Sequence, residues 1–334
     1  MNQIIRDGRR QSIARAFLYP VLKRDNVTVL VSTHVNRVLF KRRRATGVEC
    51  VRDGKLVSFR AEREVILATG GFNTPKLLML SGIGDRAELR AAGIDPLVHS
   101  PEVGKNVQDH ILHGGCLYEA PEPFEYRNSA ANVSGYFKTD PSFELPDVSL
   151  VQIELPYASE VVAAQYSPPP TSWALCAGLV APQSRGTARL RSNNPADRPI
   201  VDMQFLSHPE DVEALKRSIG LARAVAASSA MRPFVVREVA PGRDLNDAEL
   251  ANFVRDGATT YFHSSGACRM GQDDRAVVDA ELRVNGVENL RIADSTVMPR
   301  IVAAPTMPAC VLIGMRMAEL LAPNGHSHGG RDRD

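Results

Sequence analysis

The chain has 334 residues, 44% of them hydrophobic and 23% charged, a composition typical of a globular protein with roughly two domains. A net charge of +2 is too small to indicate nucleic acid or a membrane surface as a partner, and the longest apolar run, residues 302–315, is too short to span a bilayer. Five widely spread cysteines without a CxxC pair argue against a disulfide framework or a structural zinc site, so a reducing cytoplasm fits best.

The first elements in chain order are predicted to be β-strands. Residues 26–40 are rich in β-branched side chains, and valines alternate with other residues at their start. Residues 45–51 and 55–62 have the same character and are separated by the turn sequence RDG. Strand-like runs divided by short turns predict an antiparallel β meander.

An apolar strand then runs into two glycines. Residues 65–68 suit a strand that is buried on both faces, as in a parallel sheet. Gly70 and Gly71 follow it, where the backbone either passes close to a ligand or turns sharply. Thr74 and Pro75 are expected to be the N-cap and first residue of a short helix that ends at Gly82.

The middle of the chain, residues 112–255, differs in character from the flanking parts. It holds most of the prolines and alternates short strand-like segments with loops. One helix is clear, because Ser207 and Glu210 match a capping box and apolar residues follow at helical spacing, namely Val212, Leu215, Ile219 and Ala222. This region is predicted to be a separate domain with a mixed antiparallel sheet.

Near its end the chain returns to a strand followed by a polar residue. Residues 290–293 form a short apolar strand that stops at Asp294, and a closing helix is predicted over residues 309–321. A carboxylate at the end of a strand in an open α/β sheet can hold a ribose or ribityl hydroxyl. The Asp294 carboxylate can instead cap the following turn, and on these residues alone the capping role is favoured.

The most chemically suggestive stretch is HSSGACRMG, residues 263–271. It places His263 five residues before a Cys-Arg pair, with no other His, Asp or Glu in the stretch. A metal ligand, a partner for a reactive cysteine and a proton acceptor are all open for His263 on these residues alone.

Four segments in order carry a resemblance to a known family. They are GFNTPKLLMLSGIGD (71–85), LRAAGIDPLVHSPEVGKNVQDH (89–110), HSSGACRMG (263–271) and VVDAELRVNGVENLRIADSTVMP (277–299). Together they resemble the glucose–methanol–choline (GMC) family of FAD-dependent oxidoreductases, from about residue 5 to residue 321. The resemblance implies FAD as cofactor and oxidation of an alcohol to an aldehyde or ketone, with hydride passing to the flavin.

The resemblance also implies a fold, an α/β arrangement that is α+β overall. An incomplete, discontinuous Rossmann-like FAD-binding domain is expected over 1–111 and 256–322, a substrate-binding domain over 112–255 and a disordered tail over 323–334. Family members begin with a strand and a GxGxxG loop, which this sequence lacks. We therefore expect the N-terminal βαβ unit to be absent, and a complementing segment or chain to be needed for FAD binding.

Site residues follow from the same resemblance. His263 corresponds to the general base. Pro305 stands where the family has a second hydrogen-bonding residue, and pyridoxine oxidases look similar at this position. Asp109 and His110 are expected to be mainly structural. Positions matching cofactor-binding residues are Val35, Thr69, Gly70, Gly71, Asp294, Ser295, Thr306 and Met307.

The leading hypothesis is an FAD-dependent alcohol oxidase or dehydrogenase, similar to choline dehydrogenases, that acts on a small-molecule alcohol. Two alternatives remain. One is a lyase of the same family that acts on cyanohydrins and keeps the flavin without reducing it. The other is a non-catalytic or partner-complemented remnant.

Overall fold

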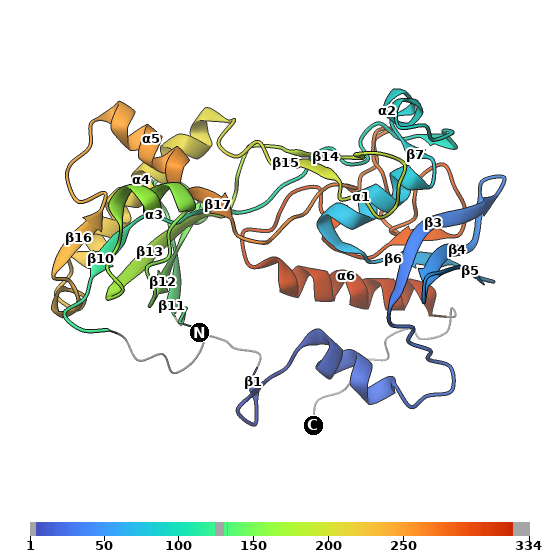
Figure 1. Cartoon of the computed structure of the whole chain (residues 1–334), viewed down its shortest axis with the longest axis horizontal. Helices are drawn as coiled ribbons and strands as arrows, with labels where there is room; N and C mark the ends of the chain where they lie inside the picture. Colours follow the sequence, from blue (N-terminus) through green and yellow to red (C-terminus); the bar gives the residue numbers. More distant parts are fainter. Residues whose placement is uncertain (1–4, 124–129, 132, 323–334) are drawn as a thin grey trace.

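The protein has two lobes side by side in a computed structural model that describes residues 5–123, 130–131 and 133–322 (Figure 1). Each lobe has its own hydrophobic core. One core is built from residues between Val38 and Val103 and between Cys268 and Met317, and the other from residues between Ile111 and Val254. In the described part, no helix is both long and apolar enough to cross a bilayer.

An antiparallel meander forms one end of the first lobe, which confirms that prediction. Its strands are β3 (Thr33–Lys41), β4 (Arg44–Arg52) and β5 (Lys55–Arg60). The prediction was wrong for residues 26–32, which precede β3 without strand structure. Ser32 has a left-handed backbone with φ of 52°, which interrupts an extended strand. Val31 is 74% exposed, so the alternating valines do not form a buried face.

A parallel strand pair lies at the centre of this lobe. Strand β6 (Val65–Leu67) pairs in parallel with β18 (Leu290–Ile292), Val65 opposite Leu290. Both predicted strands are therefore confirmed. The expectation that β6 is buried on both faces was wrong, because Ile66 is 39% exposed. The carboxyl ends of the two strands lead into adjacent loops, which carry Gly70 and Asp294.

Helix α1 (Gly70–Leu80) begins earlier than the cap signal predicted. Thr74 and Pro75 lie inside the helix, and the Thr74 hydroxyl donates to the Asp294 carboxylate instead of capping. A tertiary hydrogen bond has thus overridden the local signal. The rest of this segment comprises β7 (Ile83–Gly84), α2 (Arg86–Ala91) and β8 (Val98–His99).

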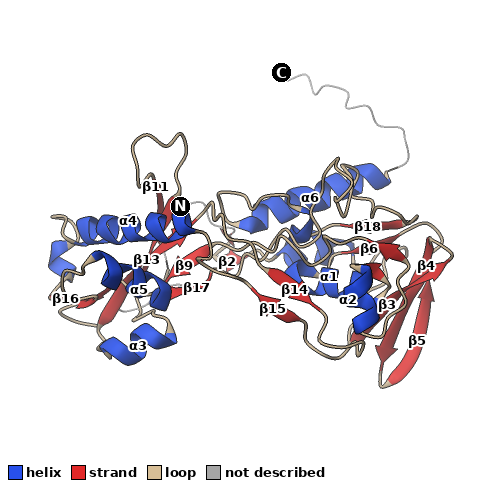
Figure 2. Cartoon of the chain, turned by 90° about the horizontal axis from the view of Figure 1, so that it is seen from above, coloured by secondary structure: helices blue, strands red, loops and turns tan. Residues whose placement is uncertain are grey.

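The second lobe is built on a seven-stranded antiparallel sheet (Figure 2). Its main path runs β11-β12-β13-β10-β16, while β9 pairs with both β13 and β17. The strands are β9 (Ile111–His113), β10 (Leu117–Glu119), β11 (Val133–Phe137), β12 (Val148–Ile153), β13 (Ser172–Leu179), β16 (Arg237–Ala240) and β17 (Ala258–Thr260). The predicted antiparallel sheet is confirmed.

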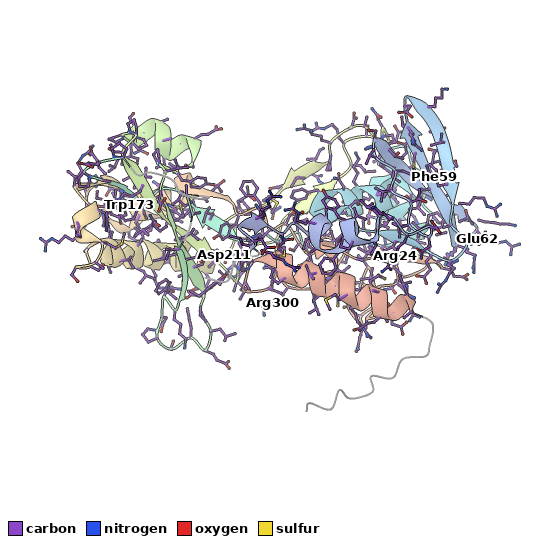
Figure 3. The ribbon with its side chains drawn as sticks, turned by 90° about the horizontal axis from the view of Figure 1, so that it is seen from below. Arg24, Phe59, Glu62, Trp173, Asp211 and Arg300 are labelled. Carbon is purple, nitrogen blue, oxygen red and sulfur yellow. The ribbon has the colours of Figure 1, made fainter. Side chains whose placement is uncertain are left out.

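Helices α3 (Glu160–Tyr166), α4 (Pro209–Ala226) and α5 (Asp247–Gly257) accompany this sheet. The apolar face predicted for α4 is buried, which confirms that helix. Its cap was predicted wrongly, since the His208 side chain, not Ser207, accepts the Glu210 N–H. Trp173 on β13 is fully buried in this lobe, and Phe59 on β5 lies in the other (Figure 3).

Part of the middle region departs from the expected division. Strands β14 (Thr187–Arg189) and β15 (Ile200–Asp202) form a hairpin that reaches the first lobe, where β14 lies near α1 (Figure 1). Asp211, at the junction of the lobes (Figure 3), accepts the Ser184 N–H and hydroxyl just before β14. The hairpin contacts the first lobe through the Pro195 carbonyl, which accepts from Lys76 Nζ of α1 at 2.6 Å. Residues 187–202 therefore pack outside the lobe that holds most of 112–255.

The chain closes with α6 (Thr306–Leu321), which confirms the predicted final helix and extends it by one turn at its start. It follows a short turn, η4 (Ser295–Val297). The predicted tail, residues 323–334, lies outside the described residues. At the other end are β1 (Ile5–Arg6), β2 (Arg9–Arg10), η1 (Ala14–Leu18) and η2 (Tyr19–Val21).

Candidate active site

His263 lies in the loop that leads from β17 back to the first lobe. Its backbone N–H donates to Asp109 Oδ1 at 2.8 Å, and Thr260 Oγ1 donates to Asp109 Oδ2 at 2.5 Å. Asp109 is buried, and that burial raises the pKa of its carboxyl. One buried carboxylate thus binds both ends of the turn that presents the imidazole, through the Thr260 hydroxyl and the His263 backbone N–H.

The turn itself contains an unusual residue. Phe262 has a left-handed backbone with φ of 60° and a side chain that is 79% exposed. Bulky residues rarely adopt that conformation, so the surrounding hydrogen bonds must impose it. The Phe262 N–H donates to Thr260 Oγ1 at 2.9 Å, and the Tyr261 ring lies 4.9 Å from the His263 ring.

A second histidine contacts the first. Nδ1 of His110 lies 2.8 Å from Nδ1 of His263, with the two rings nearly perpendicular. Nε2 of His110 lies 2.9 Å from the Val302 carbonyl oxygen. Burial, helped by the neighbouring His263, lowers the pKa of His110 to about 4, and burial also lowers the pKa of His263. Both imidazoles are therefore neutral at neutral pH.

Asp294 joins the loops that follow the two parallel strands. Its Oδ2 accepts from the Gly70 N–H at 3.0 Å and from the Thr74 hydroxyl, and its Oδ1 accepts from the Thr296 N–H and hydroxyl. A carboxylate has about four acceptor positions. Those of Asp294 are occupied by protein donors, so the side chain holds the β6–α1 and β18–η4 loops together.

These loops also contact the residue after His263. The Ser295 hydroxyl donates to the Ser264 carbonyl at 2.7 Å. A Cβ atom added to Gly71 would lie 2.2 Å from Ser264 Oγ and 2.7 Å from Ser264 Cβ. Only glycine permits this approach. The structure thus brings Gly71 and Ser295 against the loop that carries His263.

Two further predicted cofactor residues share a cavity. Val35 and Thr69 both line a cavity of about 240 Å³ between β3 and α1. Gly70 beside it has a left-handed backbone with φ of 82°, and no atom lies within 4 Å of the position a Cβ would take. Open space at a strand end, beside a glycine that needs its conformational freedom, suits the close approach of a dinucleotide.

Pro305, Thr306 and Met307 lie where α6 begins. Pro305 occupies the N-cap position, Thr306 is buried and Met307 is 38% exposed. The segment before the helix reaches the histidine pair through the Val302 carbonyl that contacts His110. Proline has neither a side-chain donor nor a backbone N–H, so Pro305 cannot donate a hydrogen bond to a substrate.

Asp109 and His110 were expected to be mainly structural. Asp109 has such a role, since it accepts the His263 backbone N–H. Sequence reasoning missed the contact of His110 with the ring of His263. The available signal was the pairing of two titratable residues, QDH, immediately before β9. Nothing in the sequence indicates that residues 153 positions apart meet.

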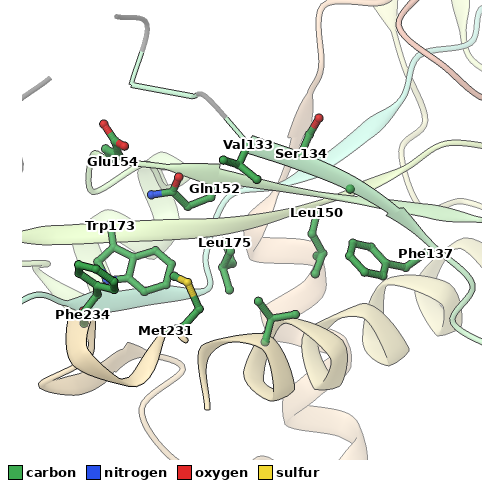
Figure 4. Close-up of a pocket in the computed structure, with 12 residues that line it drawn as sticks. Val133, Ser134, Phe137, Leu150, Gln152, Glu154, Trp173, Leu175, Met231 and Phe234 are labelled. Atoms are coloured by element: carbon green, nitrogen blue, oxygen red, sulfur yellow. The ribbon is translucent and has the colours of Figure 1, made fainter. Parts of the chain in front are cut away.

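A mainly apolar cavity of the second lobe lies away from the histidine site. It has a volume of about 470 Å³ between the sheet and the end of α4, and its lining includes Leu150, Trp173, Leu175 and Met231 (Figure 4). None of the residues of the histidine site lines it. Within the described ranges, no group of three or more His, Cys, Asp or Glu side chains is placed to hold a metal ion.

Comparisons with known proteins agree on one family. Two family models described as GMC oxidoreductase match residues 1–112 and 182–314. The mitochondrial choline dehydrogenase of Mus musculus is 35% identical over 98% of this chain, and the choline oxidase of Arthrobacter globiformis is 36% identical over 94% of it. The crystal structure of pyridoxine 4-oxidase from Mesorbium loti matches 95% of the chain with a TM-score of 0.90 and 32% identity. The chain spans 58%, 59% and 62% of these proteins, respectively.

Proposed function

The chain belongs to the GMC oxidoreductase family, and from this premise we propose that it serves the FAD-dependent oxidation of an alcohol to an aldehyde or ketone, with His263 as general base. The observation that carries the proposal is the half-buried imidazole of His263. It is neutral at neutral pH, is fixed through its backbone by Asp109, and lies beside the strand-end loops that carry Gly71 and Ser295. A fixed imidazole with a pKa below working pH is suited to accept a proton.

Oxidation of an alcohol requires a hydride acceptor and a proton acceptor. When bound, FAD supplies the acceptor for the hydride of the carbinol carbon. His263 takes the hydroxyl proton on a ring nitrogen as the C–H bond breaks, so the electrons of the O–H bond form the new C=O bond. The protein must therefore position one base and keep it unprotonated, and Asp109 and the surrounding burial do both.

The residues present fit the cofactor at several points. We propose that the backbone of Thr69, Gly70 and Gly71 approaches the dinucleotide, with open space above Gly70 and with Gly71 packed against Ser264. Val35 is proposed for the adenine side, where it lines the same cavity as Thr69. Asp294 contributes by holding its two loops in place. The remaining contacts are proposed for Ser295, beside the His263 loop, and for Thr306 and Met307 at the start of α6.

Pro305 limits how the substrate oxygen is held. It corresponds to the second hydrogen-bonding position of the family, where a side-chain donor would share the developing charge. Because Pro305 has no such donor, we propose that His263 is the principal protein contact of the alcohol oxygen. The likeness to pyridoxine 4-oxidase supports testing pyridine methanols and other aromatic primary alcohols first.

An open sheet edge supports a role for a further segment. In a parallel strand pair, the backbone N–H and C=O groups of successive residues point alternately to the two edges of a strand. Val65 and Leu67 face β18, so the backbone N–H and C=O of Ile66 face away from it. No bridge is formed on that edge of β6 within the described residues, and the Ile66 side chain is 39% exposed. Parallel sheets normally continue and are covered on both faces. We propose that a βαβ unit with a glycine-rich loop pairs there and completes the FAD site.

The test is an FAD titration followed by anaerobic addition of alcohols, on the 334-residue chain alone and on the chain joined to a GMC βαβ unit. We expect the shifted absorbance of bound flavin only in the joined protein, and bleaching when a primary alcohol is added. Bound flavin in the chain alone would refute the need for the added unit. Bound flavin that stays oxidised with every alcohol but accompanies cyanohydrin cleavage would replace the oxidase proposal with the lyase alternative.

A further inference from the structure

His110 is a buried histidine with a close partner at each ring nitrogen. Burial and His263 lower its pKa, and the backbone carbonyls of Val302 and Val180 oppose that shift. Its Nε2 lies 2.9 Å from the Val302 carbonyl oxygen, and a carbonyl oxygen can only accept a hydrogen bond. Nε2 therefore carries a proton. The side chain is 1% exposed, and the lowered pKa of His110, about 4, leaves the ring neutral. A neutral imidazole has one N–H, so Nδ1 of His110 presents a lone pair.

That lone pair points to a specific state of His263. Nδ1 of His263 lies 2.8 Å from Nδ1 of His110, a distance at which one of the two nitrogens must donate. We propose that His110 is a positioning residue that holds His263 in the tautomer with its proton on Nδ1 and its lone pair on Nε2. Nε2 of His263 is then the atom that receives the alcohol proton, a consequence that rests on the proposed function.

The opposite arrangement is disfavoured by electrostatics. If His110 donated from Nδ1, its Nε2 lone pair would face the Val302 carbonyl oxygen at 2.9 Å, with two acceptors in contact and no proton between them. Burial makes an unpaired acceptor costly, because no water can donate to it. Because neutral imidazole tautomers differ little in intrinsic stability, this penalty decides which one is populated.

The consecutive residues Asp109 and His110 thus bind the backbone and the ring of His263, respectively. Asp109 accepts the His263 backbone N–H, and His110 accepts the proton of its ring. Both precede β9, which pairs with β17 at the root of the His263 loop. The pairing of two strands of the second lobe therefore sets the geometry of a base that lies beside the loops of the first.

The test reads the tautomer directly and needs neither flavin nor substrate. In a long-range ¹H–¹⁵N spectrum of the 334-residue chain with ¹⁵N-labelled histidine at neutral pH, protonated and unprotonated ring nitrogens resonate far apart. We expect Nδ1 of His263 and Nε2 of His110 to be protonated and the other two nitrogens bare. A protonated Nε2 on His263, or values averaged between the two tautomers, would overturn the proposal.

Two variants separate tautomer control from simple packing. His110→Leu should move the His263 signals toward the averaged values of a free imidazole, whereas His110→Gln, whose carbonyl can accept from Nδ1, should restore the fixed pattern. His113 serves as an internal control, because its Nε2 lies 3.1 Å from the Phe253 carbonyl and its signals report an intact β9. Unchanged His263 signals in His110→Leu, with His113 also unchanged, would refute the role of His110.

Activity then distinguishes the inference from the proposed function. In the flavin-loaded protein, His110→Leu should lower kcat/KM by roughly 10²–10⁴-fold, the range of general base catalysis, and His110→Gln should recover most of it. A fixed tautomer in a flavin-loaded protein that oxidises no alcohol would refute the proposed function and leave the tautomer assignment standing. Equal activity of His110→Leu and the unchanged protein would contradict the positioning role.

Discussion

At the scale of single residues, His263 is the side chain on which the chemistry depends. Replacing it with alanine removes the proton acceptor while leaving the backbone hydrogen bond to Asp109 in place. We expect His263→Ala to lower the rate of flavin reduction by roughly 10²–10⁴-fold, the range of general base catalysis, without loss of bound flavin. The exposed His99, changed in the same way, should leave the rate unaltered. Equal rates in the two variants would show that another group accepts the proton.

The pH dependence follows from the same residue. Burial lowers the pKa of His263 below the ordinary value of 6.5, so the neutral form persists to lower pH than for an exposed histidine. The profile of kcat/KM should therefore have its acid limb below pH 6.5 and be flat above it until another group titrates. The measurement is kcat/KM against pH in the flavin-loaded protein, and an acid limb above pH 6.5 would contradict the assignment.

The sequence identifies one of the two histidines of the site but not the other. His263 was identified from a contiguous motif, because the residues that mark it are its near neighbours. His110 was not identified, because its role comes from contacts with His263 and with Val302, which lie 153 and 192 positions away. Local patterns report local geometry, and a contact between distant segments depends on the pairing of β9 with β17.

At the scale of elements, the approach of α1 to the His263 loop requires a residue without a side chain. A methyl group on Gly71 would lie 2.7 Å from Ser264 Cβ, so Ser264 and its neighbour His263 must shift. We expect Gly71→Ala to cost about 1–3 kcal/mol of unfolding free energy and to reduce activity.

Gly220 offers a matched control for that substitution. It lies in α4 with nothing within 4 Å of its Cβ position, and alanine favours a helix over glycine by roughly 1 kcal/mol. Gly220→Ala should therefore be neutral or stabilising in urea unfolding. A similar loss in both variants would mean that the contact between Gly71 and Ser264 is unimportant.

The element boundaries show where local signals are overridden. The apolar face of α4 predicted the helix correctly, because burial and helical spacing agree there. For α1, Thr74 and Pro75 resembled a helix start, but the Thr74 hydroxyl binds Asp294, which lies 220 positions later. The predicted strand 26–40 included residues 26–32 because β-branched side chains are frequent and alternate there, but such a pattern has no effect where neither face is buried.

At the scale of the whole molecule, buried histidines connect stability to pH. His110 and His113 are both buried, and burial lowers the pKa of each to about 4 from 6.5. Between these values the unfolded chain binds more protons than the folded one, so the unfolding free energy falls as the pH is lowered from 6.5 to about 4. Each shift is worth at most about 3 kcal/mol.

Urea unfolding midpoints across that window are the measurement for this prediction. We expect a steady decrease toward low pH, with a shallower slope in His113→Phe, whose side chain cannot take up a proton. His99→Gln, at an exposed position, should keep the original slope. Midpoints that do not change between pH 6.5 and 4 would contradict the burial of neutral histidines.

The fold class and the division into a parallel-strand lobe and an antiparallel-sheet lobe were predictable from the sequence. Apolar runs, turns and motifs of each lobe occupy separate parts of the chain. The crossing of residues 187–202 to the first lobe was not predictable, since β14 and β15 resemble any short hairpin and their location depends on contacts such as that of Lys76 with the Pro195 carbonyl.

The most direct test of the central claim is the anaerobic reduction of bound flavin by an alcohol with hydrogen or deuterium at the carbinol carbon. The protein is the chain joined to the βαβ unit and loaded with FAD. We expect an aromatic primary alcohol to bleach the flavin, deuterium to slow the bleaching, and His263→Ala to slow it further. A flavin that stays oxidised with every alcohol tested would contradict the proposed alcohol oxidation.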